Sequence, residues 1–374
     1  MFLKKLKLSN FKNHEQSELT FNTQITSLIG RNGMGKTNLL DAIHYLSFTK
    51  SSLNPSDNQN IRYGEPYFFI EGTIEKKEKD FLVRCAYEAG NKKNFLVNKV
   101  PYEKYSDHIG EFPVVLISPN DTDLVREYSD LRRKFFDGLI CQIDRPYLEA
   151  LIRYSHFLKQ RNSLLKSLAR KQSPDGDLMD KYDAELASNG KILWAKRRDF
   201  MKEFIPVFLK KYEELSGNEP VDIKYVSDFD KGEPFSLFKQ NREKDIIMQR
   251  TTCGVHRDDF EFLLTQKPLK KNGSQGQQKS FVISLRLSQF ELIQAAKGYR
   301  PILLLDDIFD KLDDDRIDRL TSMIGKDDFG QIFITDARPE RTRSLVEKLD
   351  QKVGIFEVEN GTCIASQETT KDKN

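Results

Sequence analysis

A glycine-rich stretch near the N-terminus has the residue types and the spacing that hold phosphate. Residues 30–37 read GRNGMGKT, which fits the P-loop pattern G-x-x-x-x-G-K-[ST]. The glycines let the backbone curl until its amide N–H groups face a β-phosphate, beside the N-terminus of the next helix. We expect Lys36 to reach the β- and γ-phosphates and the Thr37 hydroxyl to bind Mg²⁺. The other residues expected to line a nucleotide here are Gly30, Arg31, Asn32, Gly33, Met34, Gly35 and Asn38. A chance glycine turn is the alternative.

An acidic motif far along the chain supplies the second half of such a site. Residues 301–307 read PILLLDD, an apolar strand that runs directly into two carboxylates. This is a Walker B pattern, in which Asp306 would hold Mg²⁺ through water and Asp307 would act as the general base on the attacking water. The catalytic residues expected from sequence are therefore Asp307 and Lys36, with Thr37 and Asp306 as the metal site. The alternative is a buried strand followed by an acidic helix cap.

A third motif lies just upstream of that strand. Residues 274–278 read SQGQQ and precede a long helical segment. A serine at a helix start offers a hydroxyl and free backbone N–H groups to an anion, although Ser and Gly are also common helix caps. The position upstream of Walker B matches an ABC signature motif, so we expect Ser274, Gly276 and Gln277 to contact the γ-phosphate that the other protomer holds.

The periodicity of the chain places these motifs in an α/β fold. Apolar alternation predicts a first hairpin around Leu6 and Leu19, a strand at 25–29 and a helix over about 37–46. Further strands are expected at 68–74, 81–88, 95–100 and 114–117, and the Asn/Ser-rich residues 51–60 are expected to form a mobile loop. Lys36 and Asp306 are 270 positions apart, so a large insert must divide the fold.

The insert has helical periodicity. Apolar residues at three–four spacing run from Tyr147 to Leu168, interrupted only by Arg161, and a second stripe runs from Tyr182 to Val207. These stripes predict an antiparallel helical hairpin. The expected organisation is an ABC-type P-loop ATPase head of two lobes with an inserted helical domain: residues 1–125 form lobe I, 126–250 the helical insert and 251–374 the C-terminal part.

Composition narrows the environment and the partners. The four cysteines are widely separated and the five histidines scattered, which predicts reduced thiols and no zinc site. No signal peptide or membrane span is evident, so we expect a cytoplasmic protein without membrane contact. The net charge is +3, but residues 126–211 contain 19 Lys and Arg against 12 Asp and Glu, a net of +7 that leaves −4 elsewhere. Such a face can bind DNA phosphates, or the lysines can simply solvate helices. The candidate DNA contacts are Arg132, Arg133, Lys134, Lys196, Arg197 and Arg198.

Several motifs in order resemble the RecF family of bacterial DNA replication and repair ATPases, relatives of SMC-type heads. They are LSNFKNH (8–14), the P-loop with GKTNLLDAI, VVLISPNDTDLV with RRKFFD (132–137), HRDDF (256–260), SQGQQK (274–279), LLLDDIFDKLD and IFITDAR (332–338). The resemblance covers most of the chain.

The resemblance implies an ATP- and Mg²⁺-dependent homodimer that binds DNA, both single-stranded and gapped or junction double-stranded. Such a protein helps to load recombinase at gaps or stalled forks during DNA damage (SOS) repair, with RecO- and RecR-type mediators. It also implies a weak, DNA-stimulated ATPase.

Individual residues carry further expectations from the resemblance. Asp310, Leu312 and Asp313 look like the D-loop that passes between protomers. Lys12, in the sequence NFKN, either reaches the nucleotide or is a solvated lysine on a hairpin.

The chain departs from the general ABC pattern at three places. Asp307 stands where transporters use glutamate, Thr335-Asp336 stands where a switch histidine is usual, and Asn120-Asp121 occupies the Q-loop region without a glutamine. These departures suit a slow switch. The alternatives are an ABC transporter ATPase subunit, and a DNA-binding scaffold that binds ATP without useful hydrolysis.

Overall fold

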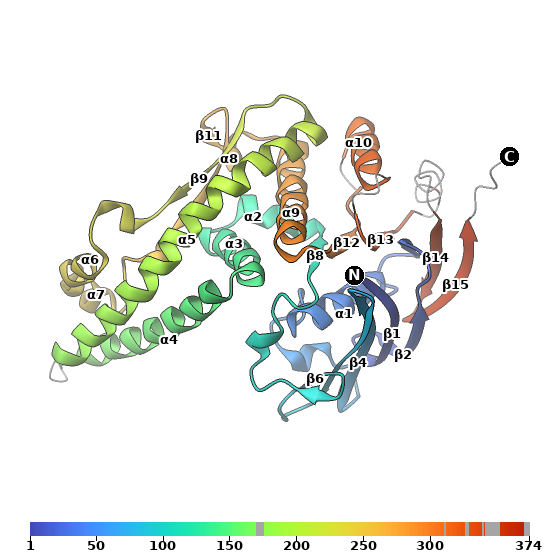
Figure 1. Cartoon of the computed structure of the whole chain (residues 1–374), viewed down its shortest axis with the longest axis horizontal. Helices are drawn as coiled ribbons and strands as arrows, with labels where there is room; N and C mark the ends of the chain where they lie inside the picture. The colour runs from blue at the N-terminus through green and yellow to red at the C-terminus, as the bar shows by residue number, and fades with distance from the viewer. Residues whose placement is uncertain (170–175, 310–311, 326–328, 339, 341–351, 370–374) are drawn as a thin grey trace. The chain divides into compact units, whose positions relative to one another are not determined.

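The computed structural model describes residues 1–169, 176–309, 312–325, 329–338, 340 and 352–369 (Figure 1). By internal packing the chain divides into two units. Unit 1 contains residues 1–121 and 283–374, and unit 2 contains residues 122–282. Unit 2 is thus longer than the insert expected from sequence, because residues 251–282 belong to it as well.

The central sheet of unit 1 contains the strand that leads into the P-loop and the two strands that end in aspartate, at Asp306 and Asp336. Its order is β15-β14-β3-β13-β12-β8, and all neighbours are parallel except β14 and β15. The strands are β3 (Ile25–Ile29), β8 (Val114–Ile117), β12 (Ile302–Asp306), β13 (Ile332–Asp336), β14 (Val353–Glu359) and β15 (Thr362–Thr369). Every residue of β3, β12 and β13 is buried, as in a parallel sheet covered on both faces. Because β13 lies between β3 and β12 and is parallel to both, the carboxyl ends of all three strands meet at one edge of the sheet.

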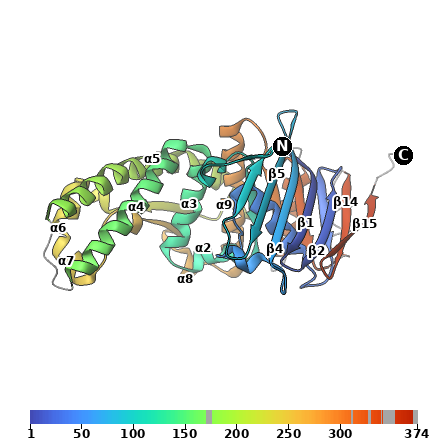
Figure 2. The ribbon, with the colours of Figure 1, turned by 90° about the horizontal axis from the view of Figure 1, so that it is seen from below.

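A second, antiparallel sheet of unit 1 has the order β2-β1-β4-β5-β6-β7, and Figure 2 shows β5, β4, β1 and β2 side by side. Its strands are β1 (Phe2–Phe11), β2 (His14–Thr20), β4 (Tyr67–Lys76), β5 (Lys79–Glu88), β6 (Asn94–Val97) and β7 (Val100–Pro101). The prediction of one strand over 95–100 is wrong at its C-terminal end. Asn98 and Lys99 have positive φ and form a turn between β6 and β7.

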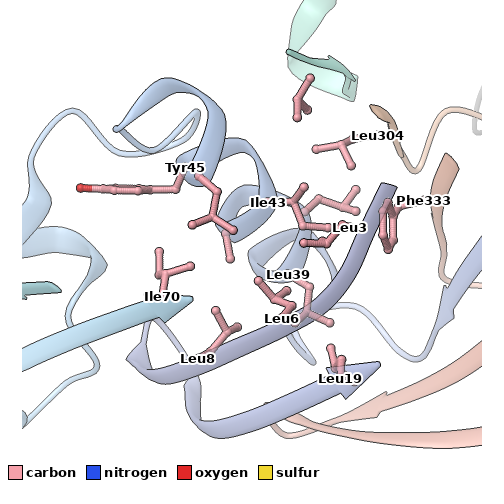
Figure 3. Packing of buried hydrophobic residues seen from close by; sticks show 14 of the residues in the cluster. Leu3, Leu6, Leu8, Leu19, Leu39, Ile43, Tyr45, Ile70, Leu304 and Phe333 are labelled. Atoms are coloured by element: carbon pink, nitrogen blue, oxygen red, sulfur yellow. The ribbon is translucent and has the colours of Figure 1, made fainter. Parts of the chain in front are cut away.

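Helix α1 (Lys36–Phe48) follows the P-loop and supplies the core of unit 1. Its side chains Leu39 and Ile43 pack against Leu3 and Leu6 of β1, in one cluster with residues of the central sheet (Figure 3). Burying each of these side chains contributes about 1.5–3 kcal/mol. The core therefore fixes the helix that begins at Lys36.

The remaining elements of unit 1 are short or follow the central strands. They are the 3-10 turns η1 (Asp57–Asn60), η2 (Tyr105–His108) and η3 (Pro119–Thr122), the last of which ends in unit 2, and helix α10 (Asp314–Gly325). Helix α9 (Gln275–Lys297) begins in unit 2 and ends in unit 1. The segment 51–60, expected as a mobile loop, contains η1 and is bonded through Ser51 and Ser52 to Asp41.

Unit 2 contains the predicted helical hairpin. Its long helices are α4 (Arg145–Leu168) and α5 (Gly176–Ser216), which lie side by side in both views (Figures 1 and 2). The expected turn at 173–176 falls largely outside the described residues. Arg161, which interrupts the apolar seam of α4, is fully buried and pairs with Asp183 of α5 at 2.6 Å and with Asp245 at 2.6 Å.

A small sheet and several short helices complete unit 2. The sheet has the order β11-β10-β9, which pairs β9 (Val221–Val226) with β10 (Asp259–Leu264) and β10 with β11 (Lys267–Pro268). The other helices are α2 (Asp123–Arg126), α3 (Ser129–Ile143), α6 (Pro234–Gln240), α7 (Arg242–Met248) and α8 (Leu269–Asn272), with 3-10 turns η4 (Asp228–Lys231) and η5 (Val255–Arg257). The pairing of β9 with β10 is the reason that residues after 250 belong to unit 2.

Candidate nucleotide site

The P-loop has the backbone that its glycines predict. Gly30, Gly33 and Gly35 all have positive φ, a conformation that is easy only for glycine. A Cβ on Gly30 would lie 2.3 Å from the carbonyl oxygen of Val358 in β14, so a side chain cannot be accommodated there without movement. The close approach of β14 thus requires glycine at the first position of the loop. Arg31, Asn32 and Gly33 are exposed, and Met34 is half-buried.

Lys36 lies across the loop it follows. Its Nζ donates to the carbonyl oxygens of Gly30 at 2.7 Å and Arg31 at 3.0 Å, and the residue is 5% exposed. Burial lowers the pKa of the Lys36 ammonium, while nearby carboxylates, those of Asp307 and Asp306 first, oppose the shift. The lysine is therefore held inside the loop, facing the acidic end of β12.

Thr37 and Asp306 come together as the sequence predicts. The Thr37 hydroxyl donates to Oδ1 of Asp306 at 2.9 Å, across 269 positions of sequence. Burial raises the pKa of Asp306, and hydrogen bonds from Thr335 and Thr37 counteract that rise. A hydroxyl and one carboxylate suit Mg²⁺, which keeps several waters and binds few protein ligands together with substrate phosphates. Among the described residues no group of three or more His, Cys, Asp or Glu could hold a metal.

Thr335, at the place of the usual switch histidine, connects the Asp306 carboxylate to the backbone of Asp307. Its hydroxyl donates to Oδ1 of Asp306 at 2.7 Å and accepts from the backbone N–H of Asp307 at 3.0 Å. Asp307 has a φ of 44°, a left-handed conformation that few residues other than Gly, Asn and Asp adopt readily. One hydroxyl therefore fixes both the metal-site carboxylate and the turn that presents the candidate base.

Two turns from opposite ends of the chain brace the P-loop, and sequence reasoning did not find them. Asn13 donates from Nδ2 to Met34 O at 3.0 Å and accepts at Oδ1 from Asn38 at 2.7 Å. His14 is fully buried, with Nε2 3.1 Å from Gly35 O and Nδ1 2.7 Å from Gly361 O in the β14–β15 turn. The one available signal was the motif NFKNH, which places polar side chains at the end of an apolar strand.

Lys12 is not a solvated lysine. Its ammonium lies 2.7 Å from Oδ2 of Asp41 on α1, with the Lys12 side chain 8% exposed and that of Asp41 1% exposed. Asp41 also accepts hydrogen bonds from Ser51 and Ser52. Lys12 therefore ties the β1–β2 turn to the P-loop helix, and its contact with a nucleotide stays a prediction.

The D-loop and Q-loop regions are partly described. Asp310 lies outside the described residues, Leu312 is half-buried, and Asp313 accepts from the backbone N–H of Arg316 at 2.9 Å, which caps α10. In the Q-loop region Asp121 forms an ion pair with Arg286 at 2.5 Å.

The signature segment lies in unit 2 at the start of α9. Ser274 is exposed, and its Oγ accepts from the N–H of Gln277 at 3.2 Å, while Oε1 of Gln277 accepts from the N–H of Ser274 at 2.8 Å. This reciprocal pair is a capping box, so Ser274 does cap the helix. Gly276 is half-buried. A cap of this kind leaves the exposed hydroxyl at the helix N-terminus, where an anion is favoured.

The candidate DNA contacts fall into two groups. The prediction that Arg197 contacts DNA at the surface is wrong. Arg197 is 1% exposed, and its guanidinium forms ion pairs with Asp137 and Asp258. Arg132 and Arg133 are also held internally, the first by both oxygens of Asp259 at 2.8 and 2.9 Å and the second by Ser129 and the backbone of Asp258.

The other three candidates are accessible. The side chains of Lys134, Lys196 and Arg198 are 73%, 43% and 49% exposed, although Lys134 pairs with Asp130 and Lys196 with Asp144. Arg198 lies over the ring of Trp194 at 4.5 Å. Sequence spacing cannot distinguish the internally bonded candidates from the accessible ones, because adjacent residues of a helix can face the protein interior and the solvent.

In this chain one strand separates the P-loop strand from the Walker B strand, and a signature-type helix start follows a helical insert. These two features define an ABC-type P-loop ATPase head of the SMC kind. The family model described as RecF/RecN/SMC N terminal domain matches residues 2–364. The chain belongs to the RecF family: it is 45% identical over 375 residues to the DNA replication and repair protein RecF of Cytophaga hutchinsonii, covering 100% of this chain and 99% of that one.

Solved structures agree with this assignment. The recombination mediator protein RecF with ATP, of the RecFOR pathway, superposes with a TM-score of 0.88 at 26% identity and covers 98% of each chain. The Smc head domain of Pyrococcus furiosus, bound to the C-terminal domain of ScpA, superposes with a TM-score of 0.57 at 16% identity, covering 100% of this chain and 97% of that one, and shows the fold alone. The alternative of a transporter subunit is thereby replaced by the RecF family. No helix in the described part of the chain could span a membrane.

Proposed function

We propose that this protein is an ATP-dependent DNA-binding protein of DNA replication and recombinational repair. ATP closes a homodimer on DNA at single-strand gaps or stalled forks, where the protein aids recombinase loading together with RecO- and RecR-type mediators. The observation that carries the proposal is the bond between Thr37 and Asp306, which joins the P-loop to the Walker B strand in one site. The RecF relatives, 45% identical in the first case, support the DNA repair role.

Each step of ATP hydrolysis can be assigned to residues of this chain. The P-loop amides and Lys36 bind the β- and γ-phosphates. The Thr37 hydroxyl would bind Mg²⁺ and Asp306 would hold the ion through water, and the ion would offset phosphate charge. Asp307 takes a proton from the attacking water. Its carboxylate is one methylene shorter than that of glutamate and must reach further for the water, so we expect slow hydrolysis that acts as a timer, with DNA as a weak stimulant.

The second nucleotide face comes from the partner protomer. A P-loop and Walker B leave the γ-phosphate open on one side, and two protomers related by a two-fold axis can each present Ser274 to the other's site. ATP is then part of the interface, and loss of the γ-phosphate opens the dimer.

DNA binding is expected to depend on accessible cations, because phosphate contacts release counterions without reading bases. Lys134, Lys196 and Arg198 meet that requirement in unit 2. We expect the protein to act in the cytoplasm, where bacterial DNA lies.

The test is DNA binding by gel shift with ATP, with ADP and without nucleotide, using single-stranded and gapped duplex DNA. ATP should tighten binding relative to ADP, and Lys36→Met should remove that difference together with ATP-dependent dimerisation, because the γ-phosphate loses its positive partner. Equal DNA affinity of Lys36→Met and the parent protein in ATP would refute the switch. A scaffold that only binds ATP would show the nucleotide effect but no single-turnover hydrolysis.

A further inference from the structure

Gln278, on the first turn of α9, uses both ends of its amide. Its Nε2 donates to the carbonyl oxygen of Gly273 at 3.0 Å, and its Oε1 accepts from Nε of Arg126 at 3.0 Å. Gln278 itself is 7% exposed, and both bonds are partly buried. Gly273 directly precedes Ser274, and the glutamine therefore ties Arg126 to the signature segment.

Arg126 is the last residue of α2 and is exposed. Within the described part of the chain its two terminal guanidinium nitrogens have no hydrogen-bond or ion-pair partner, although the carboxylates of Asp123 and Glu127 flank it in sequence. A guanidinium held at Nε keeps its remaining donors in a fixed plane, which suits bidentate contact with phosphate oxygens. Arg126 is thus an oriented cation beside an exposed, anion-favouring helix start.

We propose that Arg126 contacts the γ-phosphate of the ATP held by the opposite protomer, alongside Ser274. The inference rests on the proposed function, since it requires the ATP-bound dimer. In hydrolysis the water oxygen bonds to the γ-phosphorus, the bond to the β–γ bridging oxygen breaks, ADP keeps the electron pair and Asp307 takes the proton. Arg126 offsets the negative charge on the γ-phosphoryl oxygens as this occurs, which an arginine supplied in trans does effectively. Gln278 is a positioning residue that acts through Arg126.

The neighbouring cations provide a matched control. Lys270 and Lys271 on α8 are exposed and lie only four and three positions before Ser274, and no hydrogen bond from their ammonium groups is present in the described structure. They contribute charge near the same segment without an oriented contact. A general electrostatic effect would therefore respond to Lys271→Ala as much as to Arg126→Ala.

The first experiment measures ATP hydrolysis in single turnover with protein in excess, together with nucleotide affinity of the monomer. Arg126→Ala should lower the hydrolysis rate by about 100-fold, on the scale of losing one transition-state contact. Its nucleotide affinity as a monomer should stay within twofold of the parent. Arg126→Lys should recover only a small part of the rate, and Lys271→Ala should hydrolyse at the parent rate. Hydrolysis by Arg126→Ala within twofold of the parent would overturn the proposal.

Mixing variants tests the contact in trans. Arg126→Ala has an intact P-loop and Lys36→Met has an intact Arg126, so a mixed dimer contains one complete site, and an equimolar mixture should hydrolyse ATP faster than either variant alone. No recovery on mixing would place Arg126 in its own protomer's site and would also overturn the proposal. Gln278→Met should lower the rate in the parent background and have no added effect in Arg126→Ala; an additive loss would separate Gln278 from Arg126.

Failure of the proposed function gives a different pattern. If the parent protein forms no ATP-dependent dimer by sedimentation, or if Ser274→Arg dimerises fully with ATP, the composite site itself is wrong. If the dimer forms and depends on Ser274 while Arg126→Ala behaves as the parent, only the present inference fails.

Discussion

Replacing Thr335 with valine tests the connection between the Asp306 carboxylate and the backbone of Asp307. The substitution keeps the shape of the side chain and removes its hydroxyl, which bonds Asp306 at 2.7 Å and the N–H of Asp307 at 3.0 Å. Both bonds are lost together. The chemistry of the site should therefore suffer more than its packing does.

The magnitude follows from the two lost hydrogen bonds. A bond to a charged group contributes about 1.5–3 kcal/mol, and an unsatisfied buried N–H costs about 1–3 kcal/mol, offset by the added methyl group at about 0.8 kcal/mol. We expect the free energy of unfolding to fall by about 2–5 kcal/mol. Partners that orient a metal ligand affect metal affinity by about 10–100-fold, so the Mg²⁺ concentration that half-activates hydrolysis should rise by that factor.

The assay combines a Mg²⁺ titration of single-turnover hydrolysis with chemical unfolding. Thr335→Ser, which keeps the hydroxyl, should resemble the parent protein. Thr321→Val is the matched control, since Thr321 is a buried threonine whose hydroxyl, within the described part of the chain, bonds the carbonyl oxygen of Ile317 in α10 at 2.7 Å and no carboxylate. An unchanged Mg²⁺ requirement in Thr335→Val would refute the reasoning, whatever the change in stability.

Three further predictions concern single side chains. Asp307→Asn should bind ATP as the parent does but hydrolyse it about 10²–10⁴-fold more slowly, leaving a closed dimer on DNA that gel filtration would detect; parent-like hydrolysis would exclude Asp307 as the base. Arg197→Gln should lower the free energy of unfolding by about 3–5 kcal/mol because buried carboxylates lose their partner, whereas Arg198→Gln should leave stability unchanged and reduce the log–log salt slope of DNA binding by about one unit; the opposite assignment would contradict the burial of Arg197. Burial lowers the pKa of His108 to about 4, so the unfolded chain takes up the proton first and stability falls as the pH drops below about 6.5, by about 2 kcal/mol at pH 5. A His108→Gln variant, measured by urea unfolding at pH 7 and pH 5, should lose that part of the pH dependence.

The nucleotide half-site was predictable because each residue type has a physical role at a fixed spacing. Gly30, Gly35, Lys36 and Thr37 form one continuous motif, and Asp306 ends a short apolar run, which is typical of a buried strand. Their convergence follows from parallel strands ending at one edge of a sheet. No comparable rule exists for the bracing residues: Asn13 and His14 meet Gly35 and Gly361 through long-range packing that periodicity does not encode.

The candidate DNA contacts, unlike the nucleotide half-site, could not be predicted reliably from the sequence. The run Lys196-Arg197-Arg198 reads as one basic cluster, yet on α5 the middle residue faces the interior and its neighbours face solvent. Local charge density cannot reveal this, because the partners of Arg197 lie in α3 and before β10, at Asp137 and Asp258. Arg161 behaves in the same way within α4. A basic residue that interrupts an apolar stripe is therefore a candidate for a buried ion pair before it is a candidate for DNA.

The strand order of the central sheet has a consequence for how the protein is made. β3, which leads into the P-loop, has β13 and β14 as its two neighbours, and both come from the last 43 residues of the 374-residue chain. As the chain leaves the ribosome, β3 therefore stays unpaired on both edges through the synthesis of more than 300 residues. Unit 2 is continuous in sequence and is complete by residue 282, so it can fold first while the P-loop strand waits for its neighbours. A nascent chain thus carries its apolar strand exposed for most of translation, and a transcript that ends early yields a product without a nucleotide site and with a free strand edge open to aggregation.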